Sequence, residues 1–204
     1  MMMGKFITLE GAEGSGKSTQ SVLIMDYLKA RKVRAMLLRE PGGVKLSEKI
    51  RALLLDVAHD QMSDECETLL YMAARAQLVK EVLVPTLEKG THVICDRFLD
   101  STIAYQGAGN GVDMKAIEQI GLFATAGIKP DLTLLFDIDV SKGLSRTNAQ
   151  KDRIEQRAVD YHERVRQGYL DIAKREPKRV KVIKVDASKE EIFKQVKGYV
   201  EVIL

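Results

Sequence analysis

The segment Gly11-Ala12-Glu13-Gly14-Ser15-Gly16-Lys17-Ser18 is a full match to the phosphate-binding pattern G-x-x-x-x-G-K-[ST]. Its glycines allow backbone N–H groups to wrap around phosphate oxygens, while Lys17 reaches the outer phosphates and the Ser18 hydroxyl can ligate Mg²⁺. An apolar run at residues 6–9 precedes the segment, and a helical pattern at about residues 17–32 follows it. This placement between a strand and a helix predicts a site for ATP or GTP.

Short apolar runs alternate with longer helical patterns along the chain, which is typical of a parallel sheet covered by helices. The predicted strands are residues 6–9, 34–38, 92–95, 132–136 and 180–185. The first four are mostly apolar and are expected to be buried on both faces, whereas alternating Lys181 and Lys184 predict that the fifth lies nearer an edge. We therefore expect an α/β fold, a P-loop NTPase-type parallel five-stranded sheet with helices on both faces, in a single domain over residues 1–204.

Capping residues and a proline predict where helices begin in the middle and near the end of the chain. Ser63 is a predicted N-cap, and Pro85 is expected to kink or restart the helix that follows it. Ser188 and Glu191 have the spacing of a capping box at the start of the last helix. That helix is expected to pack on the sheet.

The overall charge is too even to indicate a nucleic-acid or membrane surface. In 204 residues there are 32 Lys or Arg against 29 Asp or Glu, a net charge of +3. Residues 142–179 carry eleven of the basic residues and six of the acidic ones, a local charge of +5. No apolar run approaches the roughly 18 residues that span a bilayer, and the N-terminus lacks the pattern of a secretory signal. We expect a cytoplasmic protein with no nucleic-acid or membrane partner.

Cysteine and histidine residues give no sign of a metal cluster. Cys66 and Cys95 need not form a disulfide in an intracellular chain of this size, and Cys95 is expected to be a buried apolar residue. His59, His92 and His162 are scattered without ligand spacing and are expected in loops or on the surface.

Arginine residues follow the predicted strands on the side where parallel sheets bind ligands. Arg97 comes directly after a buried strand and is predicted to bind a phosphate, whereas for Arg39 and Arg51, taken singly, a surface charge is the favoured interpretation. Asp96, at the end of the same strand as Arg97, has the position of a Walker-B acid. Phosphoryl transfer needs such cationic groups around the migrating phosphate.

Two further patterns suggest nucleotide contacts. Tyr71 and Arg75 lie four residues apart on a predicted helix, so they can form a shelf for a nucleobase, the alternative being a core tyrosine beside a solvated arginine. A basic segment after the fourth strand, residues 142–157, is either a solvated helix face or a short lid that brings cations to the γ-phosphate.

Taken together, the sequence resembles the thymidylate kinase family of P-loop nucleoside monophosphate kinases, in its bacterial-type arrangement. The strings that carry the resemblance are Leu9-Glu10-Gly11 through Thr19, Arg39-Glu40-Pro41-Gly42-Gly43, Leu69-Leu70-Tyr71-Met72-Ala73-Ala74-Arg75, Asp96-Arg97-Phe98, Ser101 through Gln106 and Asp152-Arg153-Ile154-Glu155. The phosphate loop is shared by many families, but D-R-F followed by S-T-x-A-Y-Q is much more specific.

The resemblance implies a dTMP site made of residues from several strings. They are Arg39, Arg51, Tyr71, Arg75, Arg97, Ser101, Thr102, Tyr105 and Gln106. Tyr71, where the family commonly has Phe, would stack on thymine, and Arg75 would hydrogen-bond the base with Ser101, Thr102 and Gln106 nearby on the pyrimidine edge. Tyr105 would lie against the deoxyribose and disfavour a 2′-hydroxyl. The three remaining arginines would surround the dTMP phosphate.

The resemblance also implies the ATP site and the catalytic groups. ATP would be bound by Gly11, Ala12, Glu13, Gly14, Ser15, Gly16, Lys17, Ser18 and Thr19. Ser18 would hold Mg²⁺, with Asp96 or Glu13 acting through water, and Glu13 would meet the sugar 3′-hydroxyl or the magnesium shell. Catalysis would fall to Lys17, Arg97, Arg153, Arg146 and Glu13. Since the loop offers no arginine, the lid would supply it, with Arg153 in the larger role and Arg146 close behind.

The function implied is transfer of the γ-phosphoryl group of ATP to dTMP, a step toward dTTP for DNA replication, by a protein that is a homodimer by analogy with the family. One alternative is a kinase for another monophosphate or a nucleoside. The other is a P-loop ATPase that acts as a regulatory or nucleic-acid-linked switch, against which the modest net charge counts.

Overall fold

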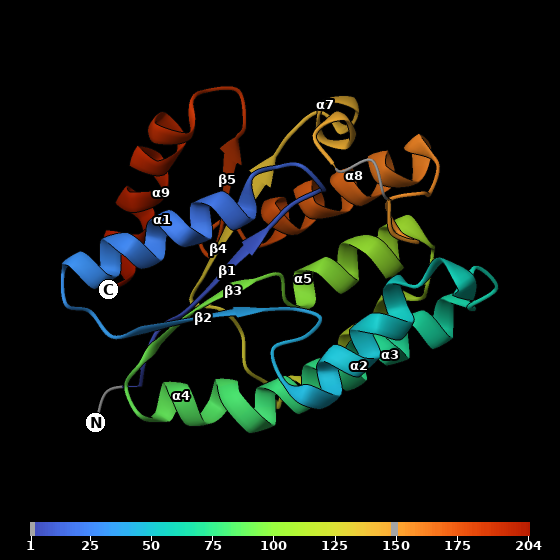
Figure 1. Ribbon diagram of the computed structural model, residues 1–204, viewed down its shortest axis with the longest axis horizontal. Coiled ribbons are helices and arrows are strands. Elements are labelled where there is room, and N and C mark those ends of the chain that lie inside the picture. Colours follow the sequence, from blue (N-terminus) through green and yellow to red (C-terminus); the bar gives the residue numbers. More distant parts are fainter. Residues whose placement is uncertain (1–2, 148–150) are drawn as a thin grey trace.

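The computed structural model describes residues 3–147 and 151–204. Its strands are β1 Phe6–Glu10, β2 Ala35–Arg39, β3 His92–Asp96, β4 Leu132–Asp137 and β5 Val180–Lys184. They form a five-stranded sheet in the order β2-β3-β1-β4-β5, with every neighbouring pair parallel. The predicted parallel sheet is confirmed, and β1, which leads into the phosphate loop, is its central strand (Figure 1).

Helices cover both faces of this sheet. They are α1 Lys17–Ala30, α2 Lys45–Leu55, α3 Asp64–Leu78, α4 Val84–Glu88, α5 Leu99–Thr102, α6 Met114–Ala124, α7 Val140–Ser145, α8 Val159–Arg175 and α9 Lys189–Ile203. Successive side chains of β1 point to opposite faces, as in any strand. Ile7 packs in one core cluster with Ile24 of α1 and Val196 of α9, whereas Phe6 packs in another with Leu78 of α3. In Figure 1, α1 and α9 accordingly lie on one side of the strands, and α3 and α4 on the other.

The edge strands differ in part from the prediction. β5 lies at an edge as expected, but β2 occupies the opposite edge, and its Met36 and Leu37 are 38% and 40% exposed. The expectation that the second strand is buried on both faces is therefore wrong. An apolar run alone does not show whether a strand has one neighbour or two, because an edge strand can carry apolar residues that its covering elements leave partly open.

The helix signals are confirmed. Ser63 accepts a hydrogen bond from the Cys66 amide at 3.2 Å, and Ser188 and Glu191 form a complete capping box. The helix α3 gives way to a π-turn at Val79–Leu83, and α4 restarts at Val84 with Pro85 in its first turn. A second π-turn, Ile103–Gly109, follows α5, and a short 3₁₀ turn lies at Val57–His59.

This arrangement brings the ends of neighbouring strands together at one edge of the sheet. In the ladders, Leu9 pairs with Asp96, and Asp96 pairs with Arg39. The phosphate loop, Arg39 and Arg97 therefore leave the sheet side by side, at the edge where ligands of α/β sheets bind. No helix among the described residues is long and apolar enough to cross a membrane.

Candidate active site

The phosphate loop joins β1 to α1 and depends on close backbone approaches. Gly11, Gly14 and Gly16 have φ angles of 138°, 66° and 85°. A Cβ added at Gly14 would lie 2.1 Å from the carbonyl oxygen of Gly143, and one added at Gly11 would lie 2.4 Å from that of Phe136. Only glycine satisfies both the conformation and the space at these two positions. The pattern seen in the sequence is thus required by the shape of the loop.

Lys17 lies within this loop and is almost fully buried. Its Nζ donates to the carbonyl oxygens of Gly11 at 3.0 Å and Ala12 at 2.8 Å. Burial, followed by the charge of Arg97, lowers the pKa of Lys17 to about 8, although Asp96 and other carboxylates act in the opposite direction. A phosphate anion in the loop would favour the charged form of Lys17 by direct pairing.

Arg97 connects β3 to the phosphate loop. Its Nη1 donates to the carbonyl oxygen of Gly11 at 3.0 Å and to the Tyr169 hydroxyl at 3.1 Å, while Nη2 donates to Glu13 Oε1 at 3.0 Å and to the Tyr105 hydroxyl at 3.1 Å. The backbone of Arg97 has φ 72°, a left-handed conformation that costs a non-glycine residue roughly 1–2 kcal/mol. Its contacts therefore hold a strained residue in place at the end of the strand.

Glu10 holds the backbone segment that comes directly after β3 through hydrogen bonds. It is fully buried; Oε1 accepts from the Phe98 amide at 2.7 Å, and Oε2 contacts the hydroxyls of Ser101 at 2.5 Å and Tyr169 at 3.1 Å. Burial, reinforced by the charge of Asp100, raises the pKa of Glu10 to about 8. Glu10 was not predicted as a site residue, although it directly precedes Gly11 in the L-E-G string.

Glu13 faces two different environments. Its Oε1 accepts from Tyr105 at 2.6 Å and from Arg97 at 3.0 Å. Burial would raise the pKa of Glu13, but the charges of Arg97 and Lys17 outweigh it, and the net shift is downward. Its Oε2 lies 3.8 Å from Nδ1 of His162, and none of these atoms has a hydrogen-bond partner among the described residues. His162 is buried within α8, so its predicted place in a loop or on the surface is wrong.

Tyr71 and Arg75, the residues predicted to form a nucleobase shelf, border the same cavity, and Arg75 is not solvated. Arg75 is 2% exposed; Nε donates to Glu40 Oε2 at 2.7 Å, Nη1 to Thr102 Oγ1 at 3.0 Å and Nη2 to the Phe98 carbonyl at 3.0 Å. Tyr71, one turn before Arg75 on α3, borders the same cavity. A buried guanidinium held from several sides is a rigid donor for a ligand.

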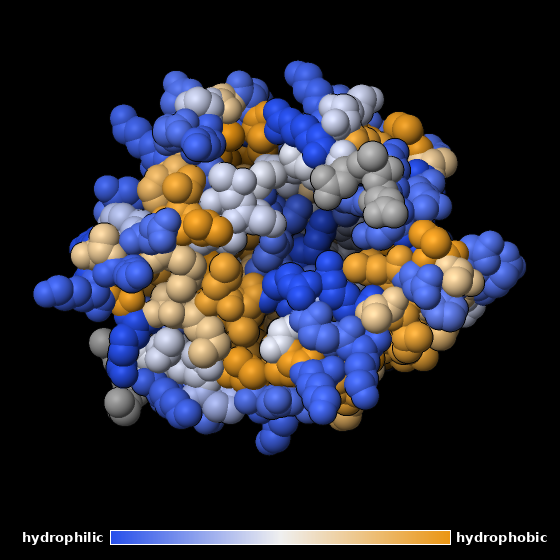
Figure 2. Space-filling model, in the orientation of Figure 1, coloured by the Kyte–Doolittle hydropathy of each residue, from blue (hydrophilic) through white to orange (hydrophobic). Residues whose placement is uncertain are grey.

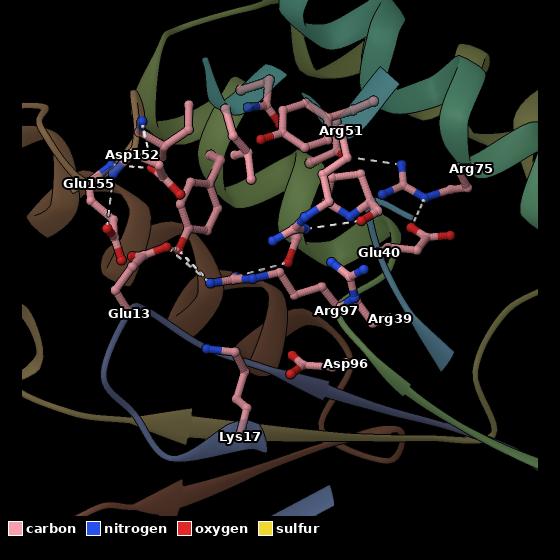
Figure 3. A pocket seen from close by; sticks show the side chains of 18 of the residues that line it. Glu13, Lys17, Arg39, Glu40, Arg51, Arg75, Asp96, Arg97, Asp152 and Glu155 are labelled. Carbon is pink, nitrogen blue, oxygen red and sulfur yellow. Dashed lines mark hydrogen bonds and ion pairs between the residues drawn. The ribbon is translucent and has the colours of Figure 1, made fainter. Parts of the chain in front are cut away.

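These groups surround one cavity of about 330 Å³. Its lining comprises Glu13, Gly14, Lys17, Ser18, Arg39, Glu40, Pro41, Arg51, Leu55, Tyr71, Arg75, Asp96, Arg97, Ser101, Thr102, Tyr105, Gln106, Asp152, Ile154 and Glu155. In Figure 2 the surface is hollowed near the middle of the view, and hydrophilic side chains line the hollow. Figure 3 shows Lys17, Asp96, Arg97 and Glu13 facing one space, with Arg39, Arg51 and Arg75 along its other side.

All nine residues predicted to bind dTMP border the cavity, whereas only four of the nine residues predicted to bind ATP do so. Those of the loop that border the cavity are Glu13, Gly14, Lys17 and Ser18. Arg51 donates to the Pro41 carbonyl at 3.0 Å, and Arg39 donates to Glu48 at 2.7 Å with its side chain 48% exposed. Ser18 donates to Asp96 Oδ2 at 3.0 Å, which joins two of the three residues predicted around Mg²⁺.

The two lid arginines lie in different places, and the predicted lid includes residues 148–150, which are outside the described part of the chain. Arg146 is exposed and donates to the carbonyl oxygen of Gly14 in the phosphate loop at 3.4 Å. Arg153 does not border the cavity; it is buried and donates to Glu67 Oε2 at 2.5 Å and to the Leu54 carbonyl at 2.9 Å.

Sequence reasoning missed most of the acidic groups of the site. Glu40 and Glu67 each hold an arginine, yet neither was assigned a role. Both could have been suspected from position, because Glu40 belongs to the R-E-P-G-G string and Glu67 precedes Tyr71 by one helical turn. Asp152 and Glu155 border the cavity from the segment after Arg146 and were noticed only as part of a string.

Comparisons with known proteins agree with this geometry. Residues 9–196 match the family model described as thymidylate kinase. A thymidylate kinase of Carboxydothermus hydrogenoformans is 46% identical over 202 residues, which covers 98% of each chain. A thymidylate kinase of Symbiobacterium thermophilum is 44% identical over 203 residues, which covers 99% of this chain and 95% of that one.

A solved structure shares the fold as well as the sequence. The crystal structure of thymidylate kinase from Ehrlichia chaffeensis superposes with a TM-score of 0.81 at 33% identity, covering 97% of this chain and 99% of that one. The match extends over the sheet, the phosphate loop and the segments that carry Tyr71, Arg97 and Gln106. The chain therefore belongs to the thymidylate kinase family, the enzymes that transfer a phosphoryl group from ATP to dTMP and yield dTDP.

Proposed function

We propose that the cavity holds dTMP with its phosphate next to the γ-phosphate of ATP, and that Arg97 binds the acceptor phosphate at their junction. The observation that carries this proposal is the position of Arg97, whose guanidinium touches both Gly11 of the phosphate loop and Tyr105 of the nucleoside side. A bidentate donor at this point can hold a phosphate between the two substrates. Lys17 lies on the donor side of the junction.

The proposed reaction is an in-line transfer without a general base. A dTMP phosphate oxygen is already ionised at neutral pH, so the protein need not remove a proton from it. Catalysis then depends on holding the two phosphates in line and on neutralising negative charge as the phosphoryl group moves. Lys17 and Arg97 supply positive charge from the loop and from β3.

The residues at the loop also fit Mg²⁺. This ion prefers oxygen ligands and usually keeps several waters, and it is held in such sites by a loop hydroxyl and substrate phosphates. The Ser18 hydroxyl and the Asp96 carboxylate lie 3.0 Å apart, which suits one direct ligand and one acting through water. When bound, the ion would reduce the negative charge between the phosphates. No group of three or more His, Cys, Asp or Glu suited to a metal occurs in the described ranges.

The arginine that completes the transition-state charge is proposed to come from the lid. Arg146 already reaches the phosphate loop through Gly14, whereas Arg153 must leave Glu67 before it can approach the phosphates. Both therefore stay candidates, and they differ in how much rearrangement they require.

We further propose that the protein acts as a homodimer. On α6, Leu122 and Phe123 are 61% and 86% exposed, and Leu69 of the neighbouring α3 is 53% exposed. Large apolar groups gathered on packed helices are typical of an interface. Phe123→Glu should convert a dimer to a monomer in light scattering, while Val202→Glu on α9, also exposed, should leave the mass unchanged. A cytoplasmic location and the absence of nucleic-acid or membrane partners stay predictions from the sequence.

The acceptor is tested by an ADP-release assay over dTMP, dUMP, dCMP, UMP and thymidine. Our proposal predicts the highest kcat/KM with dTMP. Preference for dCMP or for thymidine would contradict it. ATP hydrolysis that is stimulated by DNA and indifferent to dTMP would instead support the rival ATPase switch.

A further inference from the structure

Glu67 is a fully buried carboxylate that accepts hydrogen bonds from four residues in two segments. Oε1 accepts from Gln106 Nε2 at 2.8 Å and from Asn110 Nδ2 at 3.1 Å, and of these two residues Gln106 borders the cavity. Oε2 accepts from Arg153 at 2.5 Å and from Arg157 at 2.9 Å. All four partners are N–H groups, so both oxygens of the Glu67 carboxylate act as acceptors.

This acceptor fixes which way the Gln106 amide points. The oxygen and nitrogen of a glutamine amide are told apart by their partners, and only the nitrogen can donate to Glu67. Gln106 borders the cavity, and no described residue donates to its Oε1. The amide oxygen is therefore the atom that Gln106 has available for a ligand.

An acceptor at this place discriminates between pyrimidines. Thymine and uracil carry an N–H at N3 beside a carbonyl at C4, whereas cytosine has a bare nitrogen at N3 beside an amino group. Arg75 can donate to a C4 carbonyl, and the Gln106 oxygen can accept from an N3–H. With cytosine, Arg75 would face the amino group at C4, which is also a donor, and the Gln106 oxygen would face the bare N3, which is also an acceptor. Both mismatches leave buried polar groups unpaired.

We propose that Glu67 is a specificity-determining positioning residue, which excludes cytosine by holding the Gln106 amide oxygen toward the base. The inference rests on the proposed function, since it assumes that the base lies beside Gln106 and Arg75. Glu67 itself does not border the cavity and acts through Gln106.

Glu67→Gln is the informative change because it keeps the shape but adds a donor. The new amide has one oxygen, and Arg153 and Arg157 compete for it more strongly than neutral donors do. Its NH₂ group then faces Gln106, which must flip to present its own oxygen. The flipped Gln106 turns its NH₂ group toward the base, an arrangement that suits the bare N3 of cytosine and opposes the N3–H of thymine.

The experiment measures kcat/KM for dTMP and dCMP in matched variants. The ratio of dTMP to dCMP should fall about tenfold or more in Glu67→Gln. It should stay at the wild-type value in Asn110→Ala, which removes another Glu67 contact, and in Glu67→Asp, which keeps an acceptor-only group. In a Gln106→Leu background, Glu67→Gln should cause no additional change in the ratio, because the residue through which it acts is gone.

Several outcomes would overturn the inference. An unchanged ratio in folded Glu67→Gln, with both substrates slowed equally, would show a structural role only, and a shift that persists in the Gln106→Leu background would show a route other than Gln106. Wild-type preference for dCMP would contradict the proposed function instead.

If Glu67→Gln does not fold, a measurement on the wild type tests the hydrogen bond from Gln106 to Glu67. In protein labelled with ¹⁵N-glutamine, the Gln106 side-chain amide, assigned by its loss in Gln106→Leu, should be protected from hydrogen exchange both with and without dTMP. Rapid exchange in the free enzyme would contradict the proposed hydrogen bond to Glu67.

Discussion

Arg97 donates from Nη2 to Glu13 Oε1 at 3.0 Å and so ties the end of β3 to the phosphate loop. The same guanidinium contacts Gly11 and Tyr105. One side chain thereby sets the distance between the part of the cavity that would hold ATP and the part that would hold dTMP. In a reaction that needs little covalent chemistry, this distance is what the protein must control.

Replacing Arg97 should abolish this control. Arg97→Ala is expected to lower kcat/KM for dTMP by about 10²–10³-fold, since it removes the charged donor that we propose binds the acceptor phosphate. Arg97→Lys should recover little, because an ammonium group cannot make the same paired contacts. Steady-state kinetics measure the effect, and thermal unfolding of each variant checks the fold. Near-normal activity of Arg97→Ala would remove Arg97 from the acceptor site.

Replacing Lys17 should weaken the binding of ATP and leave the binding of dTMP nearly unchanged. Lys17→Ala is expected to weaken ATP binding and to slow turnover by orders of magnitude. Binding of dTMP alone, measured by calorimetry, should change little, because Lys17 lies on the donor side of the cavity. Equal losses of ATP and dTMP affinity would argue against this division of the site.

Alanine variants of the two arginines of the predicted lid should differ in their free energy of unfolding as well as in their activity. Arg153→Ala leaves the buried Glu67 with fewer counter-charges and is expected to lower the free energy of unfolding by about 2–3 kcal/mol, less than a buried pair can cost because Arg157 remains. Arg146→Ala removes an exposed side chain and should change it by less than about 0.5 kcal/mol. Chemical denaturation measures both. Activity is then compared at a temperature where both variants are folded, and the larger loss of kcat identifies the arginine at the transition state.

Glu10 should make stability depend on pH. Its pKa is raised from 4.5 to about 8 in the folded protein by burial and by Asp100, so between these values the folded state holds a proton that the unfolded state has lost. The free energy of unfolding therefore falls as pH rises through this window, by at most about 1.4 kcal/mol per pH unit from this group.

Glu10→Gln removes that dependence while keeping the shape of the protonated acid. The wild type should lose stability relative to Glu10→Gln as the pH rises from about 5 to about 8. Urea denaturation at several pH values gives the comparison. Parallel curves, or a wild type that gains on the variant with pH, would contradict the raised pKa.

The sheet and the phosphate loop could be predicted from the sequence because both depend on local patterns. Apolar runs define the strands, and the loop glycines have conformations that other residues avoid. The edge position of β2 could not be predicted in this way, since it depends on the order of strands in space.

The candidate site was predicted through its arginines and aromatic residues, but not through the carboxylates that hold them. Glu10, Glu40 and Glu67 are buried and act on residues distant in the sequence. Their partners Ser101, Arg75 and Arg153 follow 91, 35 and 86 residues later. A pairing of this kind arises only from the folded chain, so a single sequence shows the charged residue and not its partner.

The most direct test of the account is to follow the phosphorus atoms of the reaction by ³¹P NMR with ATP, Mg²⁺ and dTMP. Direct transfer between adjacent phosphates predicts that ADP and dTDP appear in equal amounts, with inorganic phosphate at background. Release of inorganic phosphate at a rate independent of dTMP, without dTDP, would contradict it.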